Sequence, residues 1–188
     1  MNSPTSDSIL TLEPLLEAVQ DGLASSGWEL SGLQKTTSRE FEGRWAGEST
    51  RSAYLFFHRP DLPDSVSVES FLDETSRGLK GNLSLVVDGP RLHEVGALQS
   101  VLQRLATATS ETLPPGYRTP ISARVVLDDP DTPPGDGEVQ VRIRLLLPRA
   151  AMDAGASAVS ALVSGAVSAF ERLLERPEVA ELLPPVMD

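Results

Sequence analysis

Cysteine is absent from this chain of 188 residues, and histidine occurs only twice. Without a thiol, the sequence offers no disulfide, no thiolate nucleophile and no cysteine metal site. His58 and His93 stand far apart in the sequence. Their spacing is not a ligand pattern, and a catalytic or metal role would require a nucleophile or carboxylates to join them in space. Neither histidine is therefore expected to be catalytic or to bind a metal.

Motifs for nucleotide binding and nucleophilic hydrolysis are also missing. The sequence has no G-x-S-x-G elbow, Walker loop or G-x-G-x-x-G turn. Glu40 and Glu42 fall on one face of a predicted strand, as a glycosidase pair does, but Arg44 shares that face, which indicates a solvated charged surface. We expect a protein that is not an enzyme and has no catalytic residues, metal or cofactor. An enzyme with scattered catalytic residues is the least favoured alternative.

Aromatic residues make up only 5% of the chain, and four of them fall in one stretch: Trp45, Tyr54, Phe56 and Phe57. Most aromatic side chains lie in a core. If Tyr54 and Phe56 face away from the nearest helix, they become anchors for another protein, because aromatic side chains supply much of the energy of an interface. The candidate protein-contact residues are Trp45, Tyr54, Phe56, Glu40 and Glu42.

Positive charge is scarce, since 16 Lys and Arg residues stand against 27 Asp and Glu residues and the net charge is -11. Such a protein repels phosphate backbones and anionic membrane surfaces over about 8 Å at physiological salt. The charge therefore predicts no direct binding to nucleic acid or membrane. It favours encounter with basic partners, among which DNA- and RNA-binding proteins are common.

No basic region followed by an apolar run opens the sequence, so a signal peptide is not expected and a cytoplasmic location is the default. Residues 1–7 are small and polar and are predicted to be disordered. A chain of this length buries roughly 70% of its unfolded surface, which is enough for one core. We expect a single α+β domain over 8–177 and a C-terminal tail over 178–188.

Alternation of apolar and polar residues predicts the strands. It is clearest at 138–145, where the odd-numbered positions are Val, Val, Ile and Leu. Similar patterns predict strands over 28–37, 38–46, 51–58, 83–88 and 121–127. Helical spacing predicts helices over 8–25, with its start near Glu13, and over 92–109 and 150–176, with a short helix over 67–77. The expected order is α-βββ-(α)-β-α-ββ-α, an antiparallel β-sheet flanked by α-helices.

An acidic segment over 128–138 joins the last two predicted strands and contains Asp128, Asp129, Asp131, Asp136 and Glu138. Carboxylates gathered in this way are ligands for a hard cation. However, the segment lacks the EF-hand order, and its three prolines stiffen it against wrapping an ion. An exposed, solvated turn is the favoured interpretation, and cation binding is left open.

Small residues recur along the predicted closing helix at Ala154, Ala158, Ala161 and Gly165. They allow another backbone to approach closely, whether the chain's own sheet or a second copy of the chain in a homodimer. The apolar stretch is about as long as a membrane span, but Asp153 and several serines favour a buried amphipathic helix.

The C-terminal half carries a resemblance to a known family. Its elements are Leu98-Gln-Ser-Val-Leu-Gln-Arg-Leu, then Ala123-Arg-Val-Val-Leu-Asp-Asp, then Val139-Gln-Val-Arg-Ile-Arg-Leu-Leu-Leu-Pro before the closing helix. In this order the chain resembles the YbjN-like family, which is similar in fold to the type III secretion chaperones. The resemblance implies a small, acidic, non-catalytic protein, often dimeric, that binds a client polypeptide. The segment over 60–81 departs from the family's pattern.

These observations lead to one main functional hypothesis and one alternative. The main hypothesis is a non-catalytic protein-binding module, chaperone-like or regulatory, that recognises a client protein through an exposed sheet face or edge. The expected client is a basic nucleic-acid-binding protein. The alternative is a small-molecule-sensing regulatory domain, with a pocket between the aromatic strands and the helix at 92–109.

Overall fold

Two compact units make up the chain. The computed structural model describes residues 8–37, 51–117 and 120–183. The first unit contains the chain up to Phe57 together with 69–83 and 146–165, and the second contains 58–68, 84–145 and the chain from Ala166 onward. The predicted strand over 38–46, which carries Glu40, Glu42 and Trp45, lies outside the described residues, and so does the predicted disordered segment over 1–7.

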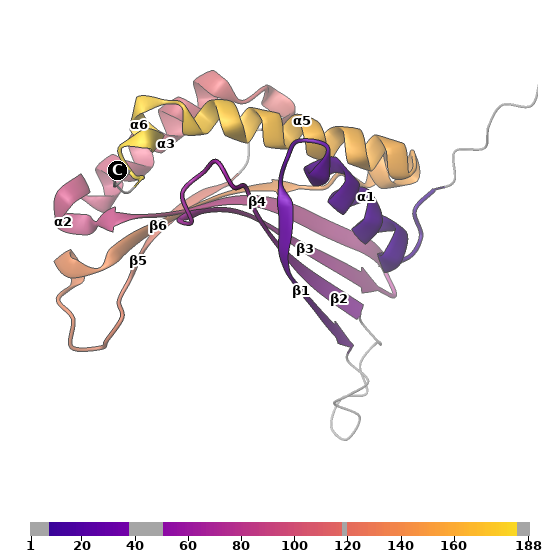
Figure 1. The fold of residues 1–188 in the computed structure, drawn as a ribbon, viewed down its shortest axis with the longest axis horizontal. Helices are drawn as coiled ribbons and strands as arrows, with labels where there is room; N and C mark the ends of the chain where they lie inside the picture. The colour runs from indigo at the N-terminus through magenta and orange to yellow at the C-terminus, as the bar shows by residue number, and fades with distance from the viewer. Residues whose placement is uncertain (1–7, 38–50, 118–119, 184–188) are drawn as a thin grey trace, which may run out of the picture. The chain divides into compact units, whose positions relative to one another are not determined.

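The fold is α+β, as the sequence predicted, with a six-stranded antiparallel sheet in the order β1-β2-β3-β4-β6-β5 (Figure 1). The strands are β1 (Glu29–Thr37), β2 (Arg51–His58), β3 (Val66–Thr75), β4 (Gly78–Arg91), β5 (Ile121–Val126) and β6 (Glu138–Leu146). The helices are α1 (Leu12–Ala24), α2 (Leu92–Val95), α3 (Leu98–Thr112), α4 (Arg149–Asp153), α5 (Ala156–Leu174) and α6 (Pro177–Ala180).

In the first unit, α1 begins at an unusual cap. Its N-cap residue, Thr11, makes no side-chain cap hydrogen bond. Instead, the backbone N–H of Leu12 donates to Oε2 of Glu74 in β3 over 2.7 Å. A carboxylate at this end of a helix is favoured by the helix dipole. The bond therefore fixes the start of α1 against the sheet.

The packing of α1 against α5 is close because Gly22 lies at the contact. A Cβ atom at this position would lie 2.7 Å from the carbonyl oxygen of Ser160 and 2.8 Å from Cβ of Val163. Further along, Ser26 Oγ lies 3.2 Å from Ser164 Oγ. The two helices thus approach through small residues on both sides.

Strand β2 has one buried face and one open face. Ala53, Leu55 and Phe57 are at most 1% exposed, whereas the side chains between them are exposed. This pattern follows from the pleat, which sends successive side chains to opposite faces. In the first unit, α1 and the first part of α5 cover the buried face (Figure 1). The other face carries no helix among the described residues.

The predicted helix over 67–77 is wrong, because this segment forms β3 and the turn into β4. Val66, Val68, Ser70 and Leu72 are buried at every second position, which is the period of a strand. Gly78, at φ 108°, closes the hairpin, and Thr75 Oγ1 donates to its carbonyl oxygen over 3.0 Å.

In the second unit, β5 pairs antiparallel with β6. The register places Ala123 opposite Val141 and Arg124 opposite Gln140. Val139, Val141, Ile143 and Leu145 of β6 are at most 5% exposed, so this strand also buries one face, as predicted. Helix α3 packs against β5 on that side.

The end of the chain packs against α3 and β4 in the same unit. Arg104 Nη1 donates to Glu181 Oε2 over 2.6 Å, and Arg176 Nη2 donates to Glu111 Oε2 over 2.5 Å. Val179 and Leu182 are at most 1% exposed. A Cβ atom on Gly89 would lie 2.9 Å from the carbonyl oxygen of Leu182, so the chain passes directly over β4 here.

Two long helices of the sequence prediction are each interrupted by a glycine. Gly96, at φ 91°, separates α2 from α3, and Gly155, at φ 101°, separates α4 from α5. A helix requires a negative φ at every residue. The single helices predicted over 92–109 and 150–176 are therefore wrong in extent, although most of each segment is helical.

An exposed ion pair in the second unit predicts a pH dependence. Arg59 donates from Nε to Asp61 Oδ1 over 2.6 Å and from Nη2 to Asp61 Oδ2 over 2.9 Å, and its Nη1 donates to Glu171. The bond from Arg59 lowers the pKa of Asp61 below its ordinary value of 3.8. A lowered pKa in the folded state adds stability that is present above the ordinary value and is lost as the pH falls through the folded value.

We therefore expect Asp61→Asn to be less stable than the natural chain at neutral pH. The difference should shrink below about pH 4 and should also shrink with added salt. Urea unfolding followed by circular dichroism at a series of pH values measures it. Asp64→Asn in the same loop removes the same charge at a residue that forms no ion pair within the described part of the chain, so it is the control for the loss of one carboxylate. A difference that is constant from neutral to acid pH would contradict the role of the ion pair.

Candidate protein-contact site

Exposed aromatic side chains stand on the helix-free sheet face of the first unit. Tyr54 is 43% exposed and Phe56 is 37% exposed, although both lie in a strand whose alternate residues are fully buried. The rings of Tyr54 and Phe71, from β2 and β3, lie 4.5 Å apart between centroids at an interplanar angle of 41°. The structure thus gives Tyr54 and Phe56 the outward orientation on which the sequence prediction depended, and it adds Phe71.

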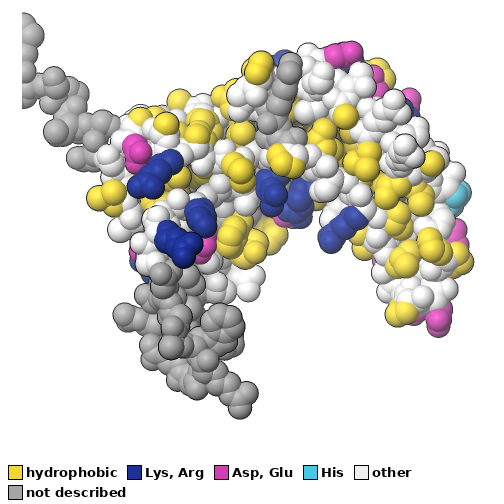
Figure 2. All heavy atoms as spheres, turned by 180° about the vertical axis from the view of Figure 1, so that it is seen from behind, with side chains coloured by type: hydrophobic (Ala, Val, Ile, Leu, Met, Phe, Trp, Pro, Cys, Tyr) yellow, Lys and Arg dark blue, Asp and Glu magenta, His cyan; other side chains and the backbone are white. Residues whose placement is uncertain are grey.

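Leu30 of β1 shares this face. A Cβ on Gly32 would lie 3.3 Å from Cδ2 of Phe56, so position 32 is on the same face of the sheet as Phe56. Leu30 is two residues earlier on the same strand and therefore faces the same way. Leu30 is 42% exposed. We call Leu30, Tyr54, Phe56 and Phe71 the aromatic face. Figure 2 shows hydrophobic side chains interspersed with Lys and Arg side chains on the surface of the described residues.

Polar contacts hold the strand that carries the aromatic face. Arg51, at the start of β2, forms ion pairs with Glu13 and, at 3.7 Å, with Glu74. Ser52 Oγ donates to Asp73 Oδ1 over 2.8 Å. These contacts connect β2 to α1 and β3 at the same end, so the aromatic side chains stand on a supported strand rather than on a loop.

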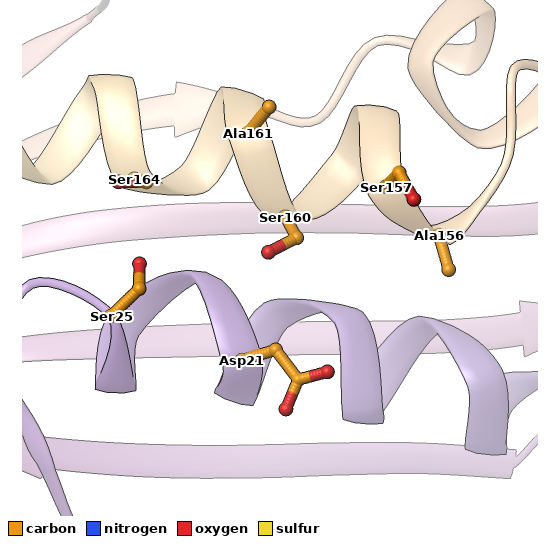
Figure 3. Close-up of a pocket in the computed structure, with 7 residues that line it drawn as sticks. All are labelled: Asp21, Ser25, Ala156, Ser157, Ser160, Ala161 and Ser164. Atoms are coloured by element: carbon orange, nitrogen blue, oxygen red, sulfur yellow. The ribbon is translucent and has the colours of Figure 1, made fainter.

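The candidate helix-packing residues lie at the surface of the first unit. Ala154 and Ala161 are exposed, and Ala158 and Gly165 are half-buried. Between α1 and α5 runs an open groove of about 420 Å³, lined by Asp21, Ser25, Ala156, Ser157, Ser160, Ala161 and Ser164 (Figure 3). Its lining is small and polar, with one carboxylate. The size and polar lining of the groove suit a small polar molecule, and none of its seven lining residues is aromatic.

In the second unit, the helix-free face of β5 and β6 carries arginines. Arg124 and Arg144 are exposed and Arg142 is half-buried, while the residues alternating with the two arginines of β6 are buried in the core. Arg124 Nε donates to Gln140 Oε1 over 2.8 Å, and Gln140 Nε2 donates to Asp88 Oδ1 over 2.7 Å. We call Arg124, Arg142 and Arg144 the arginine strip.

The two histidines stand in different elements, His58 in β2 and His93 in α2. His58 ends β2 and is exposed. His93 Nδ1 lies 3.0 Å from the carbonyl oxygen of Gly135 and 3.6 Å from Asp136 Oδ1, so it contacts the acidic segment over 128–138.

The acidic segment over 128–138 is mostly exposed, and Asp129 Oδ1 accepts a hydrogen bond from the backbone N–H of Asp131. Among the described residues, no group of three or more His, Asp or Glu side chains is arranged to hold a metal ion.

Among the helices of the described residues, α5 has the length and the apolar composition of a membrane span, and 44% of that stretch is buried inside the protein. The same composition is found in the core helix of many proteins, so it is weak evidence for a membrane. Val159, Val163, Val167 and Phe170 of α5 are at most 1% exposed. Their burial agrees with the predicted amphipathic character of this helix.

No protein-family model, curated protein or solved structure gives a significant match to this chain.

Proposed function

We propose that this chain is a non-catalytic protein-binding module, chaperone-like or regulatory, that recognises a client protein through the aromatic face. The observation that supports it most is the position of Tyr54 and Phe56, which are well exposed on a strand whose other face is fully buried. A rigid strand holds such side chains ready for contact at little cost in conformational entropy. Burying one of them in an interface is worth roughly 1.5–3 kcal/mol.

The charge of the chain bears on the choice of client. A net charge of -11 attracts basic proteins at long range, so a basic DNA- or RNA-binding protein is the client we propose. Contact with such a protein requires no direct binding to nucleic acid. The proposal also includes a cytoplasmic location and a YbjN-like, homodimeric organisation, for which the exposed small residues Ala154 and Ala161 offer a surface. Light scattering of the purified chain tests the homodimer.

The aromatic face gives the proposal a direct test. We expect a Tyr54→Ser/Phe56→Ser variant to lose at least about 90% of the client captured from cell extract by the tagged natural chain, because each serine removes an aromatic side chain that the client would bury. Quantitative mass spectrometry of the captured proteins measures this loss. Circular dichroism should show an unchanged fold, since both side chains point to solvent.

The control variant removes apolar surface elsewhere. Leu10 is 77% exposed and Leu127 is 40% exposed, and neither belongs to the aromatic face. Leu10→Ser/Leu127→Ser should capture the client as the natural chain does. Equal capture by both variants, or no protein enriched by the natural chain even at low salt, would rule out the aromatic face as the client site.

A second function is supported by the groove between α1 and α5. Its volume of about 420 Å³ and its serine and aspartate side chains suit a small polar ligand (Figure 3). It differs in place from the pocket expected beside the helix at 92–109. A thermal-shift screen tests it, because a ligand at a hundredfold over its Kd adds about 2.7 kcal/mol of stability. A shift that is unchanged in Asp21→Asn would assign the ligand to another site.

A further inference from the structure

Strand β5 forms one edge of the sheet, and among the described residues only β6 lies beside it (Figure 1). The N–H of Arg144 donates to the carbonyl oxygen of Pro120 over 3.3 Å, so these two residues form a hydrogen-bonded pair. Such pairs alternate along an antiparallel ladder. Counting from Pro120, every second residue of β5 therefore bonds to β6. The residues between them direct their N–H and C=O groups away from β6, and they are Ile121, Ala123 and Val125.

The composition of β5 favours pairing with a further strand. Lysine protects an edge strand from such pairing, and glycine weakens a strand. The strand at the other end of the sheet order, β1, contains Gly32 and Lys35, whereas β5 contains no Gly, Pro, Lys, Asp or Glu. The only charged side chain of β5 is Arg124, whose Nε donates to Gln140 Oε1 over 2.8 Å. Of the two ends of the sheet, β5 is therefore better suited to accept another strand.

The outward groups of β5 are complementary to those of a second β5. When two copies align antiparallel with Ala123 opposite itself, Ile121 lies opposite the partner's Val125. All three outward residues then form hydrogen-bonded pairs, and each pair exchanges both of its N–H···O bonds, about six bonds in all. On the helix-free face, Ser122 lies opposite the partner's Arg124, where the hydroxyl oxygen can accept a bond from the guanidinium. No two like charges are opposite each other in this register.

The same alignment keeps the acidic segments of the two copies apart. Asp128 follows Ala123 by five residues, which is about 17 Å along a strand. The two acidic segments lie at opposite ends of the paired strands, about 34 Å from each other. Charges at that distance are screened, because the Debye length is about 8 Å at physiological salt.

Helix α3, which packs against β5, adds little charge to this edge. Its charged side chains are Arg104 and Glu111, and each forms an ion pair within its own chain. Two copies can therefore approach along β5 despite a net charge of -11 on each.

We infer that β5 pairs antiparallel with β5 of a second copy about a two-fold axis at Ala123, so that the sheet continues from one copy into the other. The inference rests on the homodimeric part of the proposed function and assigns its interface to β5, in place of the surface at Ala154 and Ala161. It is independent of the client. Paired edge strands bury less area than a permanent interface does, so the Kd should lie in the range of about 1–100 µM.

Sedimentation equilibrium of the full chain measures the association. The mean mass should rise from that of one chain toward that of two as the concentration increases from about 1 to 100 µM. Ala123→Pro removes an outward N–H that β6 does not use, and should raise the Kd at least about tenfold. The control Ala123→Ser keeps this N–H and should associate as the natural chain does. Circular dichroism and thermal unfolding check that both variants are folded.

The absence of cysteine permits a second test, which examines the register. Ser122→Cys and Arg124→Cys are prepared as separate chains and oxidised alone or as a mixture. Opposite residues of a non-hydrogen-bonded pair have Cα atoms about 4.5 Å apart, a distance that a disulfide bridges. Two cysteines at the same position would lie roughly 7–8 Å apart, which is too far. The mixture should therefore form linked dimers at least about fivefold faster than either variant alone.

Each other outcome overturns the inference. A chain that remains a monomer at about 100 µM would remove the interface. A dimer that is equally stable in Ala123→Pro would lie at another surface, such as Ala154 and Ala161, and the proposed homodimer would stand without β5. Association abolished by about 0.5 M salt would assign the contact to charged side chains instead of main-chain bonds. Equal rates of linkage in the mixture and in the single variants would contradict the register.

The client proposal can be judged separately. Client capture that depends on Tyr54 and Phe56 in a chain that remains a monomer would leave client binding standing and would still overturn the pairing of β5.

Discussion

Replacing Trp28 with alanine should lower the free energy of unfolding by about 3–5 kcal/mol. Trp28 is 1% exposed and is the largest of the fully buried side chains, so the replacement leaves a cavity in the first unit. The position is also fixed by the backbone: Gly27 at φ 80° turns the chain out of α1, and the N–H of Trp28 donates to the carbonyl oxygen of Leu23 over 3.2 Å. The indole thus enters the core directly after the end of α1. Because the backbone fixes this position, the neighbouring side chains can fill little of the cavity that its removal leaves.

The measurement is chemical unfolding followed by circular dichroism, because the variant loses one of the two tryptophans on which fluorescence would depend. Leu33→Ala on β1 is the control. Leu33 is 44% exposed, so its removal should cost less than about 1 kcal/mol. A cost for Trp28→Ala no larger than that of Leu33→Ala would contradict the burial of the indole.

Gly22→Ala should destabilise the chain by about 1–3 kcal/mol, although alanine is the better helix former by roughly 1 kcal/mol. The new Cβ would meet the carbonyl oxygen of Ser160 at 2.7 Å and Cγ1 of Val163 at 2.9 Å. The first of these atoms is backbone, so it moves only if α1 and α5 separate. Separation of the helices removes packing along the whole contact, and this loss outweighs the gain in helix propensity.

A glycine without neighbours provides the matched comparison for Gly22. A Cβ on Gly116 would meet no atom within 4 Å, and its φ is not positive. Gly116→Ala should therefore leave the stability unchanged or raise it by up to about 1 kcal/mol, through the loss of freedom in the unfolded chain. Thermal unfolding of the two variants side by side measures the difference. If Gly22→Ala were as stable as Gly116→Ala, the two helices would be further apart than the structure places them.

Strands that bury one face could be predicted from the sequence, because their period of two is imposed by the core. Strand β2 begins and ends where the alternation of Ala53, Leu55 and Phe57 predicted, and β6 is predicted nearly as well. The β3 segment was mistaken for a helix because Phe71 and Leu72 are adjacent apolar residues, which fit a helical face as well as two faces of a strand. The valines at 66 and 68 were the signal that could have decided it.

Glycines inside helical patterns were the second source of error. Apolar residues continue at helical spacing on both sides of Gly96 and Gly155, so the pattern gives one long helix in each place. The positive φ of each glycine depends on where the chain must turn to reach its next contact. Just before Gly155, the carbonyl oxygen of Met152 accepts a hydrogen bond from Ile9 N–H, which joins distant parts of the sequence.

The candidate site was predicted in part. The exposure of Tyr54 and Phe56 follows from alternation once the buried face is known, whereas Phe71 was missed with the strand that carries it. The arginine strip could not be predicted from the sequence, for a different reason. Net charge sums over the whole chain, and only the pairing of β5 with β6 brings Arg124 beside Gln140 and near Arg142.

The way in which the last residues pack has a practical meaning for anyone shortening the chain. Val179 and Leu182 fill space above β4, and Glu181 holds Arg104. A fragment cut at Pro177 would uncover Gly89 and leave two guanidinium groups, Arg104 and Arg176, without carboxylates from this segment. Expression plasmids should therefore retain the codons through at least Leu183, and a purification handle belongs beyond that residue.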